Sequence, residues 1–472
     1  MSRRAAPQPD APAIRLPASF TWAVATSAFQ IEGGAAEEGK GESIWDRFAH
    51  EPGRVLDGAT GDVACDHYHR WAEDVALMTD LGVDAYRFSI AWTRVLPDGK
   101  GAVNVAGLGF YDRLVDALLA SGIEPLVTLY HWDLPQGLQD RGGWPERRTA
   151  HAFARYSDVV SARLGDRVTR WITHNEPWVA SFAGHLEGVH APGATDWTAA
   201  LRSAHHLLLS HGLAVPLIRA NSPRAEVGIA LDCRPSRPAS EDPANAAAQR
   251  HFDGFRNRWF FDPVFGRGYP EDVVAEYRRR GRLDGGQSGF EEPGDAEAIG
   301  APLDFLGINY YTSLAVGADR DETEDTGVAP GAPALSGHTE MGWPITPHAL
   351  TEFLERVHRE YAPRRILITE NGASFSDGPD SNGAVRDTRR IDYMAQHIAA
   401  VAAAIDRGVP VTGYAAWSLL DNLEWSLGFS QRFGLVWVDH GTGARIPKAS
   451  FGWYRGVIAR NGLDAAPAPS SG

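Results

Sequence analysis

Residues 170–177 read RWITHNEP, a short apolar run that ends in Asn175, Glu176 and Pro177. The run favours a buried strand, and a carboxylate so close to a buried strand needs either a partner or a use. Seven further runs are equally short and apolar and are bounded by turn residues, as the strands of parallel sheets are. The eight predicted strands span residues 20–26, 84–90, 124–132, 170–177, 226–232, 304–312, 365–372 and 411–420.

Segments with helical periodicity separate these strands. Residues 68–82 and 110–122 each place their large apolar side chains on one face and end in a glycine, Gly82 or Gly122, which is a helix stop signal. Further helices are predicted over roughly 149–164, 198–220, 243–260, 347–361, 388–407 and 447–460. Alternating strands and helices imply parallel βαβ units, and eight of them predict an α/β fold, a single (β/α)8 TIM barrel. An open, doubly wound sheet is the alternative.

No linker divides this pattern, so residues 17–462 are expected to form one barrel domain. Residues 1–16, rich in Pro and Ala, are expected to be a disordered leader, and residues 463–472 a disordered tail. Two long polar loops, 281–300 and 314–342, flank the sixth predicted strand. Elongated loops at the C-terminal face of a barrel usually shape access to its mouth.

Composition excludes several classes of protein. The formal charge of −15 argues against nucleic acid as a partner. Two cysteines in 472 residues form no disulfide framework. The first residues carry two arginines without an apolar region behind them, which is unlike a secretory signal. No apolar run approaches the roughly 18 residues that span a membrane. A cytoplasmic protein without a membrane partner is therefore expected, and its oligomeric state stays open.

Aromatic residues are abundant, with 15 Trp, 13 Tyr and 19 Phe. A large aromatic core is one explanation. A carbohydrate site, in which indole faces stack on sugar rings, is the other. Composition does not decide between them.

Polar side chains gather at or just beyond the ends of the predicted strands, where barrel enzymes carry their catalytic residues. The candidates in chain order are Gln30, Arg87, His131, Trp132, Asn175, Glu176, Asn309, Tyr311, Glu370, Asn371, Trp417, Glu424 and Trp425. A single glutamate there could be a helix cap or an ion-pair partner, and Arg87 a buried counter-ion. His131 beside Asp133 could bind a metal, but no HxH or HExxH spacing supports a metal site.

The combination is more informative than any single residue. Glu176 and Glu370 follow strands four and seven and would point into one mouth, with amide, histidine and tryptophan side chains around them. One carboxylic acid can protonate a glycosidic oxygen while the other carboxylate attacks or stabilises the anomeric carbon. The sequence therefore predicts a glycoside-cleaving enzyme.

From about residue 17 to residue 460, the chain resembles glycoside hydrolase family 1, the β-glucosidase family. The blocks FTWAVATSAFQIEGG, HWDLPQGL, THNEPW, LGINYYT, ITENGA and WSLLDNLEWSLGFSQRFGL occur in the family's order. The resemblance implies a retaining β-glucosidase that uses no metal or organic cofactor. It implies hydrolysis of terminal β-D-glucosyl residues from small-molecule aryl or alkyl glucosides, cellobiose and related oligosaccharides by double displacement.

The resemblance also implies roles for individual residues. Glu370 is the expected nucleophile and Glu176 the expected acid/base. Hydroxyl-binding and ring-stacking roles fall to Gln30, His131, Trp132, Asn175, Trp417, Glu424, Trp425 and Phe433. Arg87, Asn309 and Tyr311 are expected around the nucleophile. Trp178, Val179, His185 and Trp343 are expected on the aglycone side, where Val179 and His185 depart from the family's usual residues.

Physical chemistry adds expectations about the two carboxyl groups and their neighbours. A retaining pair needs carboxyl groups about 5–5.5 Å apart, and a cation at Arg87 with a hydroxyl at Tyr311 would keep Glu370 ionised. The anionic Glu370 would raise the pKa of Glu176, as a proton donor requires. Asn175 would offer an amide to the 2-hydroxyl of the sugar.

Two alternatives remain. A 6-phospho-β-glycosidase would typically have Ser instead of Glu424, with Lys and Tyr nearby, whereas this chain has Arg432 and Phe433 in that region. A non-catalytic sugar-binding barrel would be expected to lack Glu176 or Glu370, and both are present.

Overall fold

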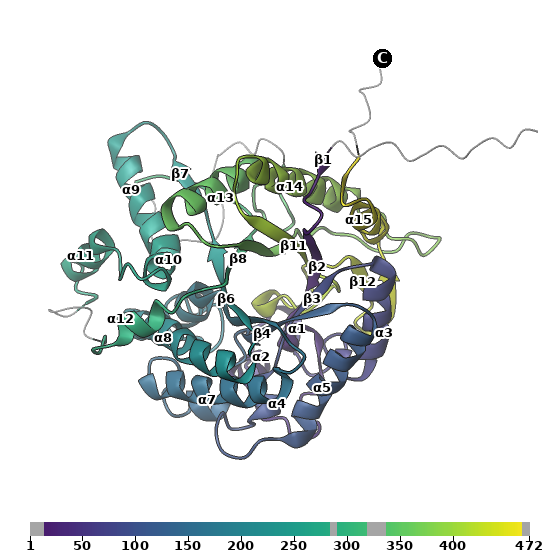
Figure 1. Ribbon diagram of the computed structural model, residues 1–472, viewed down its shortest axis with the longest axis horizontal. Coiled ribbons are helices and arrows are strands. Elements are labelled where there is room, and N and C mark those ends of the chain that lie inside the picture. Colours follow the sequence, from purple (N-terminus) through teal and green to yellow (C-terminus); the bar gives the residue numbers. More distant parts are fainter. Residues whose placement is uncertain (1–13, 284–289, 319–336, 465–472) are drawn as a thin grey trace, which may run out of the picture.

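The computed structural model describes residues 14–283, 290–318 and 337–464. Eight parallel strands close into a barrel in their order along the chain, and they form the centre of Figure 1. The barrel strands are β2 (Thr21–Ala25), β3 (Ala85–Ser89), β4 (Glu124–Tyr130), β5 (Arg170–Asn175), β6 (Glu226–Cys233), β8 (Phe305–Tyr310), β10 (Ile366–Asn371) and β11 (Val411–Trp417). Closure confirms the predicted (β/α)8 barrel and excludes the open sheet.

Helices surround the barrel, as the alternation of patterns predicts (Figure 1). The main helices are α3 (His67–Leu81), α5 (Val105–Ala120), α7 (Arg147–Leu164), α8 (Trp197–Asn221), α9 (Pro243–Asp253), α10 (Trp259–Val264), α13 (Pro347–Tyr361), α14 (Thr388–Asp406) and α15 (Ala449–Arg460). Gly82 has a φ of 78° and ends α3 as predicted. The single helix expected over 243–260 is instead broken by the π-helical turn η3 (Gly254–Arg258) between α9 and α10.

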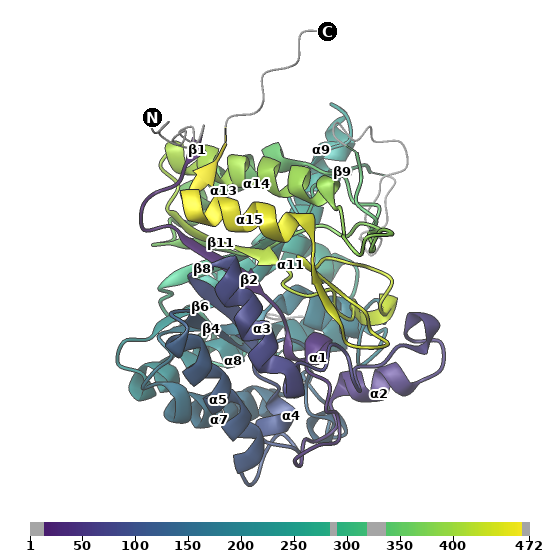
Figure 2. The same ribbon diagram turned by 90° about the vertical axis from the view of Figure 1, so that its right-hand side faces the viewer.

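Shorter elements fill the connections. They are α1 (Ala28–Ile31), α2 (Ile44–His50), η1 (Leu56–Gly58), α4 (Trp92–Val95), α6 (Gln136–Gln139), η2 (Val179–Ala183), α11 (Glu271–Arg279), α12 (Asp295–Ile299) and η4 (Trp425–Leu427). In Figure 2, α1 and α2 lie beyond the end of the barrel where strand β2 finishes. Two of them, η2 and η4, contribute residues to the cavity at the C-terminal ends of the barrel strands.

Three two-stranded sheets were not predicted, because strands of two or three residues leave no periodic signal. They pair β1 (Ile14–Arg15) with β14 (Gly462–Leu463), β7 (Ser236–Pro238) with β9 (Leu314–Val316), and β12 (Val436–Val438) with β13 (Arg445–Pro447). The first pair places residues 14–15 and 463 in a sheet, so secondary structure begins before the expected domain limit of 17 and continues past the expected limit of 462. The rest of the expected leader and tail, apart from Leu16 and Asp464, lies outside the described residues.

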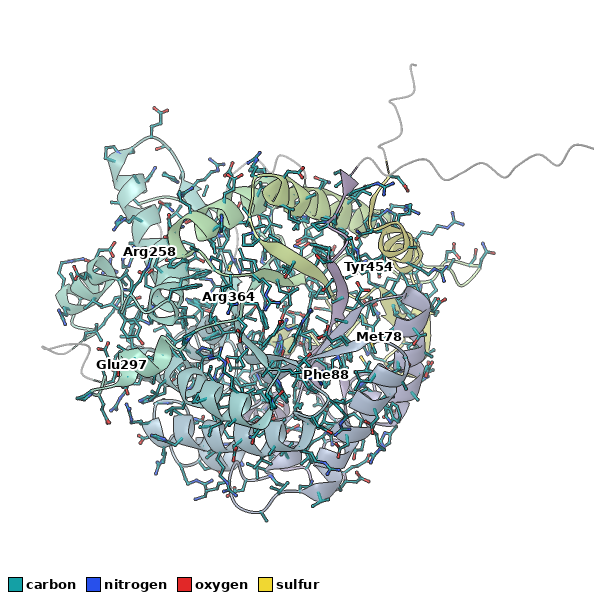
Figure 3. The ribbon with its side chains drawn as sticks, in the orientation of Figure 1. Met78, Phe88, Arg258, Glu297, Arg364 and Tyr454 are labelled. Carbon is teal, nitrogen blue, oxygen red and sulfur yellow. The ribbon has the colours of Figure 1, made fainter. Side chains whose placement is uncertain are left out.

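The core has two layers that follow from strand alternation. On β3, Arg87 points into the barrel, whereas Phe88 points outwards to the helices. Met78 of α3, Phe88 and Tyr454 of α15 lie between barrel and helices in Figure 3, and all three are buried. The Tyr454 hydroxyl also donates to the carbonyl of Ala23 on β2 (3.0 Å). Inside the barrel, a small apolar plug is formed by Leu126, Ile172, Ala230, Phe305 and Leu367.

The two long predicted loops have different positions. The first, 281–300, contains α12, which packs against α8, and its Asp295 accepts hydrogen bonds from Arg147 and His205. None of its described residues lines the cavity at the barrel mouth. In the second, Met341 does line that cavity. Residues 284–289 and 319–336 of these loops lie outside the described residues. Within the described part of the chain, no helix is long and apolar enough to cross a membrane.

Candidate active site

A cavity of about 340 Å³ opens where the strands end. Twelve of the sequence-predicted site residues line it: His131, Trp132, Glu176, Trp178, Val179, Tyr311, Trp343, Glu370, Trp417, Glu424, Trp425 and Phe433. The barrel therefore brings Glu176 and Glu370 to one space although 194 residues separate them in sequence. Closure of the sheet is the physical reason, because it places the C-terminal ends of β5 and β10 on the same rim.

Glu370, at the end of β10, is held by one cation and one hydroxyl. Arg87 Nη1 lies 2.5 Å from Glu370 Oε1, and the Tyr311 hydroxyl donates to Oε2 at 2.6 Å. Burial raises the pKa of Glu370 by more than the Arg87 charge and the Tyr311 hydrogen bond lower it, so its pKa lies above the ordinary value. Burial and the neighbouring Glu370 raise the pKa of Tyr311 well above its ordinary value, so this phenol stays protonated and acts as a donor. Both carboxylate oxygens are thus fixed in orientation.

Glu176 directly follows β5 in an unusual backbone conformation. Its φ is 47°, in the left-handed region that non-glycine residues rarely adopt. Trp132 (φ 78°) and Trp425 (φ 48°) also have positive φ and line the same cavity. Strained residues of this kind persist only where the surrounding structure imposes them, and they cluster at functional sites. The conformation turns the chain sharply at the strand end, beside the cavity that the Glu176 side chain lines.

The surroundings of Glu176 differ from those of Glu370. Its only hydrogen-bond donor among the described side chains is an amide, Asn309 Nδ2, at 2.6 Å from Oε1. Burial, then the charges of Asp232 and Glu370, raise its pKa well above the ordinary value, and Asn309 and Arg256 oppose them. The direction agrees with the sequence prediction for a proton donor, although burial and Asp232 contribute more than Glu370.

A chain of hydrogen bonds joins the two carboxyl groups. Asn175 Oδ1 accepts from Arg87 Nη2 (2.5 Å) and from Asn309 Nδ2 (2.9 Å), which assigns its amide nitrogen to His131 Nε2 (3.0 Å). Burial and the Arg87 charge lower the pKa of His131 well below its ordinary value, so the ring is neutral. Asn309 is paired in register with Glu370, so it lies around the expected nucleophile, and its amide also donates to Glu176.

Residues predicted to bind the sugar line the same cavity. Glu424, Trp425 and Trp417 are among them, and the His131 ring stacks on Trp417 (5.8 Å between centroids) and on Trp425 (5.9 Å). Burial, with Glu370 nearby, raises the pKa of Glu424 to about 8. Its Oε2 is buried and has no hydrogen-bond partner within the described structure. A hydroxyl of a bound ring would satisfy this atom.

The candidate Asn371 does not line the cavity, and its amide donates to the Tyr310 carbonyl (2.7 Å). Five residues with an expected role also do not line it. Arg87, Asn175 and Asn309 form the layer beneath it that holds the two glutamates. Gln30 accepts from Ser27 (2.6 Å) and donates to the carbonyl of Leu423 (2.8 Å), so it supports the segment that carries Glu424.

His185 is the fifth, and helical geometry explains its position. Val179, Ala183 and Glu187 line the cavity at intervals of four residues, which places them on one face of the turn. His185 lies off that face, buried, with Nδ1 3.2 Å from the Ala180 carbonyl oxygen. The cavity wall here is completed by His190 and Val189, which the sequence analysis did not single out.

Asp232, Arg234 and Arg256 also line the cavity and were missed. Asp232 lies near the end of β6, the fifth barrel strand, and carries the signal that was used on the other strands, a carboxylate at a buried strand end. Arg256 lies in η3, inside a segment predicted as continuous helix, so no sequence signal pointed to it. Within the described part of the chain, no group of three or more His, Cys, Asp or Glu residues could hold a metal ion.

Comparison with known proteins agrees with this geometry. A family model described as Glycosyl hydrolase family 1 matches residues 13–463. Beta-glucosidase A of Acetivibrio thermocellus is 46% identical over 452 residues, which cover 95% of this chain and 99% of that protein. Beta-glucosidase A of Thermotoga maritima is 45% identical over 458 residues, which cover 95% and 99%. The solved structure of a Thermotoga maritima beta-glucosidase in complex with castanospermine has a TM-score of 0.90 at 45% identity, and the match covers 96% of this chain and 100% of that chain. The chain therefore belongs to glycosyl hydrolase family 1.

Proposed function

We propose that this chain is a retaining β-glucosidase, which removes terminal non-reducing β-D-glucosyl residues from aryl and alkyl glucosides, cellobiose and related oligosaccharides. The observation that carries the proposal is the contrast between two carboxyl groups in one cavity. The Glu370 carboxylate is hydrogen-bonded to a cation and a phenol, whereas Glu176 accepts from one neutral amide and is influenced by two carboxylates, which the charge of Arg256 only partly opposes. Environments that push two carboxyl groups apart in pKa mark an acid and a nucleophile.

In the first step, Glu370 Oε attacks the anomeric carbon and the bond to the leaving oxygen breaks. Glu176 gives its proton to that oxygen, so an alcohol departs and a glycosyl ester remains on Glu370. In the second step, Glu176 takes a proton from water, and the resulting nucleophile breaks the ester. Two displacements at one carbon retain its configuration.

The neighbouring residues orient Glu370 and bind the sugar and the aglycone. Arg87 and Tyr311 orient Glu370 for attack. Asn175 is the group that we assign to the 2-hydroxyl, where hydrogen bonds strengthen in the transition state. Glu424 accepts hydrogen bonds from the hydroxyls far from the reacting carbon, and Trp417 supports the ring. Trp178, Val179 and Trp343 contact the aglycone.

The site favours a glucoside over a 6-phosphoglucoside. Glu424 lines the cavity, and a carboxyl group there offers acceptors for hydroxyls but no cation for a phosphate. Arg432, the nearest cation in sequence, donates to Asp421 Oδ2 (2.8 Å) and to the Val438 carbonyl (3.0 Å), and it does not line the cavity. Faster hydrolysis of p-nitrophenyl β-glucoside 6-phosphate than of the plain glucoside would overturn this choice.

One experiment tests substrate and stereochemistry together. Purified protein is given a panel of aryl β-glycosides and cellobiose, and NMR records the anomer that forms first. β-Glucose as the first product supports the proposal, and α-glucose refutes it. Binding of glucosides without release of product would favour a non-catalytic sugar-binding barrel.

The nucleophile has its own test. Glu370→Gln is expected to abolish turnover almost completely, and azide is expected to restore aryl release by Glu370→Gly, with α-glucosyl azide as the product. A β-azide, or no rescue, would contradict Glu370 as the nucleophile. Cytoplasmic location stays a prediction, which cell fractionation would test.

A further inference from the structure

A buried ion pair lies beside the proton donor and has no part in the mechanism above. Asp232, near the end of β6, accepts a hydrogen bond from Arg256 Nη2 of η3. The two side chains are only 7% and 2% exposed, yet both reach the cavity wall. Removing two charges from water costs free energy that pairing offsets only in part. A buried ion pair in the wall of the cavity is therefore expected to have a functional role.

Backbone pairing brings Asp232 close to Glu176. The Glu176 amide donates to the carbonyl of Ala230 on β6 (2.9 Å), and Asp232 lies two residues further along the same strand. Residues two apart share one face of a strand. On its other side, Asp232 is paired in register with Asn309 of β8, whose amide donates to Glu176.

Arg256 also contacts the segment that follows the donor. Its guanidinium carbon lies 3.3 Å from the centroid of the Trp178 ring. Trp178 is two residues after Glu176 and lines the cavity. The pair therefore links β6 and η3 to the short segment that carries both the proton donor and an aglycone-contacting ring.

We propose, on the basis of the proposed function, that Asp232 is a positioning residue for the acid/base chemistry: its carboxylate favours the protonated form of Glu176, and Arg256 limits this effect. Burial raises the pKa of Glu176 most, Asp232 is the next cause and Glu370 follows, whereas Arg256 lowers it. The charge of Glu370 disappears when it becomes a glycosyl ester, but that of Asp232 remains. Arg256 opposes the effect of Asp232, so that Glu176 can lose its proton and act as the base in the second step.

Other charged or titratable groups act on the same site. Glu370 of β10 and Tyr311, just after β8, face Glu176 across the cavity, and Cys233 follows Asp232 on β6. Arg87 of β3 reaches Glu176 only through Asn175 and Asn309. Asp232 is the second largest cause of the raised pKa of Glu176, whereas it follows burial, Arg87 and Tyr311 among the causes that act on Glu370, so its removal perturbs the donor more than the nucleophile.

The test is the pH profile of kcat/KM for cellobiose, whose poor leaving group requires a protonated donor. Asp232→Asn is expected to move the alkaline limb to lower pH by about 1 unit, because a negative charge is lost and Arg256 becomes unbalanced. The acidic limb moves less, because burial, the Arg87 charge and the Tyr311 hydrogen bond each affect the pKa of Glu370 more than Asp232 does. Arg256→Gln is expected to move the alkaline limb the opposite way, and Asp232→Glu should restore it towards the wild-type position.

Asp295→Asn is the matched control, because it breaks another buried pair, with Arg147 and His205, outside the cavity. It should move neither limb. Loss of activity by Asp232→Asn in equal proportion at every pH would overturn the proposal and leave a structural ion pair. If Asp232→Asn does not fold, the pH profile of Arg256→Gln is the test. An alkaline limb that does not move, or that moves to lower pH, overturns the proposal. A wild-type protein without glucosidase activity would instead refute the proposed function.

Discussion

Tyr311→Phe removes one hydrogen bond to Glu370, the proposed nucleophile. The phenol donates to Glu370 Oε2 at 2.6 Å and lowers the pKa of this carboxyl group. Hydrogen bonds to charged groups contribute about 1.5–3 kcal/mol, and one pKa unit corresponds to about 1.4 kcal/mol. Removing the Tyr311 hydroxyl is therefore expected to shift the acidic limb of the kcat/KM profile to higher pH by about 1–2 units.

The sign follows from which form the bond stabilises. Tyr311 donates to the ionised carboxylate, so without it Glu370 binds a proton more readily and the enzyme loses its nucleophile at a higher pH. The alkaline limb belongs to Glu176, which Tyr311 does not contact through a hydrogen bond. The bell-shaped profile should consequently become narrower from its acidic side.

Tyr310→Phe is the matched control. This neighbouring tyrosine donates to the carbonyl of Thr346 at 2.6 Å, away from the cavity. Its loss should lower thermal stability slightly, by about 0.5–1.5 kcal/mol for a neutral hydrogen bond, and should leave both limbs in place. The assay is initial-rate hydrolysis of p-nitrophenyl β-glucoside across the profile. An acidic limb in Tyr311→Phe that coincides with that of Tyr310→Phe would refute the reasoning.

Three further outcomes are expected. Glu176→Gln should slow cellobiose far more than a dinitrophenyl glucoside, because a good leaving group needs little protonation; equal losses would count against Glu176 as the acid. Burial raises the pKa of Glu424 to about 8, so the folded enzyme keeps a proton that the unfolded chain releases near the ordinary value. This contribution to stability is complete at low pH and is lost as the pH rises through about 8, so the melting temperature of Glu424→Gln should fall less with rising pH than that of the wild type. Burial raises the pKa of both Cys65 and Cys233, and neither thiol is exposed. A thiol reagent should therefore react with them only after denaturation, and reaction of the native enzyme would contradict their burial.

The barrel was predictable because its signals are local and repeated. Each strand is a short apolar run that ends at turn residues, and each long helix carries its own periodicity and stop signal. The break in the helix expected at 243–260 was not predictable, since a π-helical turn has no separate sequence pattern. The pairing of Ile14–Arg15 with Gly462–Leu463 was equally hidden, because it depends on segments that meet only after the barrel has closed.

The sequence by itself placed Glu176 and Glu370 at strand ends and identified more than half of the residues that line the cavity. Residue type and position at a strand end were sufficient for this placement, since all parallel strands of one barrel open at the same rim. The separate roles expected of the two glutamates came from the family resemblance. Tertiary structure decided which groups touch. Asn309 contacts Glu176 because of its place beneath the cavity, and His185 leaves the wall because it lies off the helical face of Val179 and Ala183.

Tertiary structure also decided the charges around the proton donor. Asp232 and Arg256 belong to different elements and form a pair only where η3 folds against β6. A pKa depends on burial and on charges within a few ångströms, and neither quantity is a property of the sequence order. The sequence therefore identifies Glu176 and Glu370, whereas the pKa values of the two carboxyl groups depend on the folded barrel.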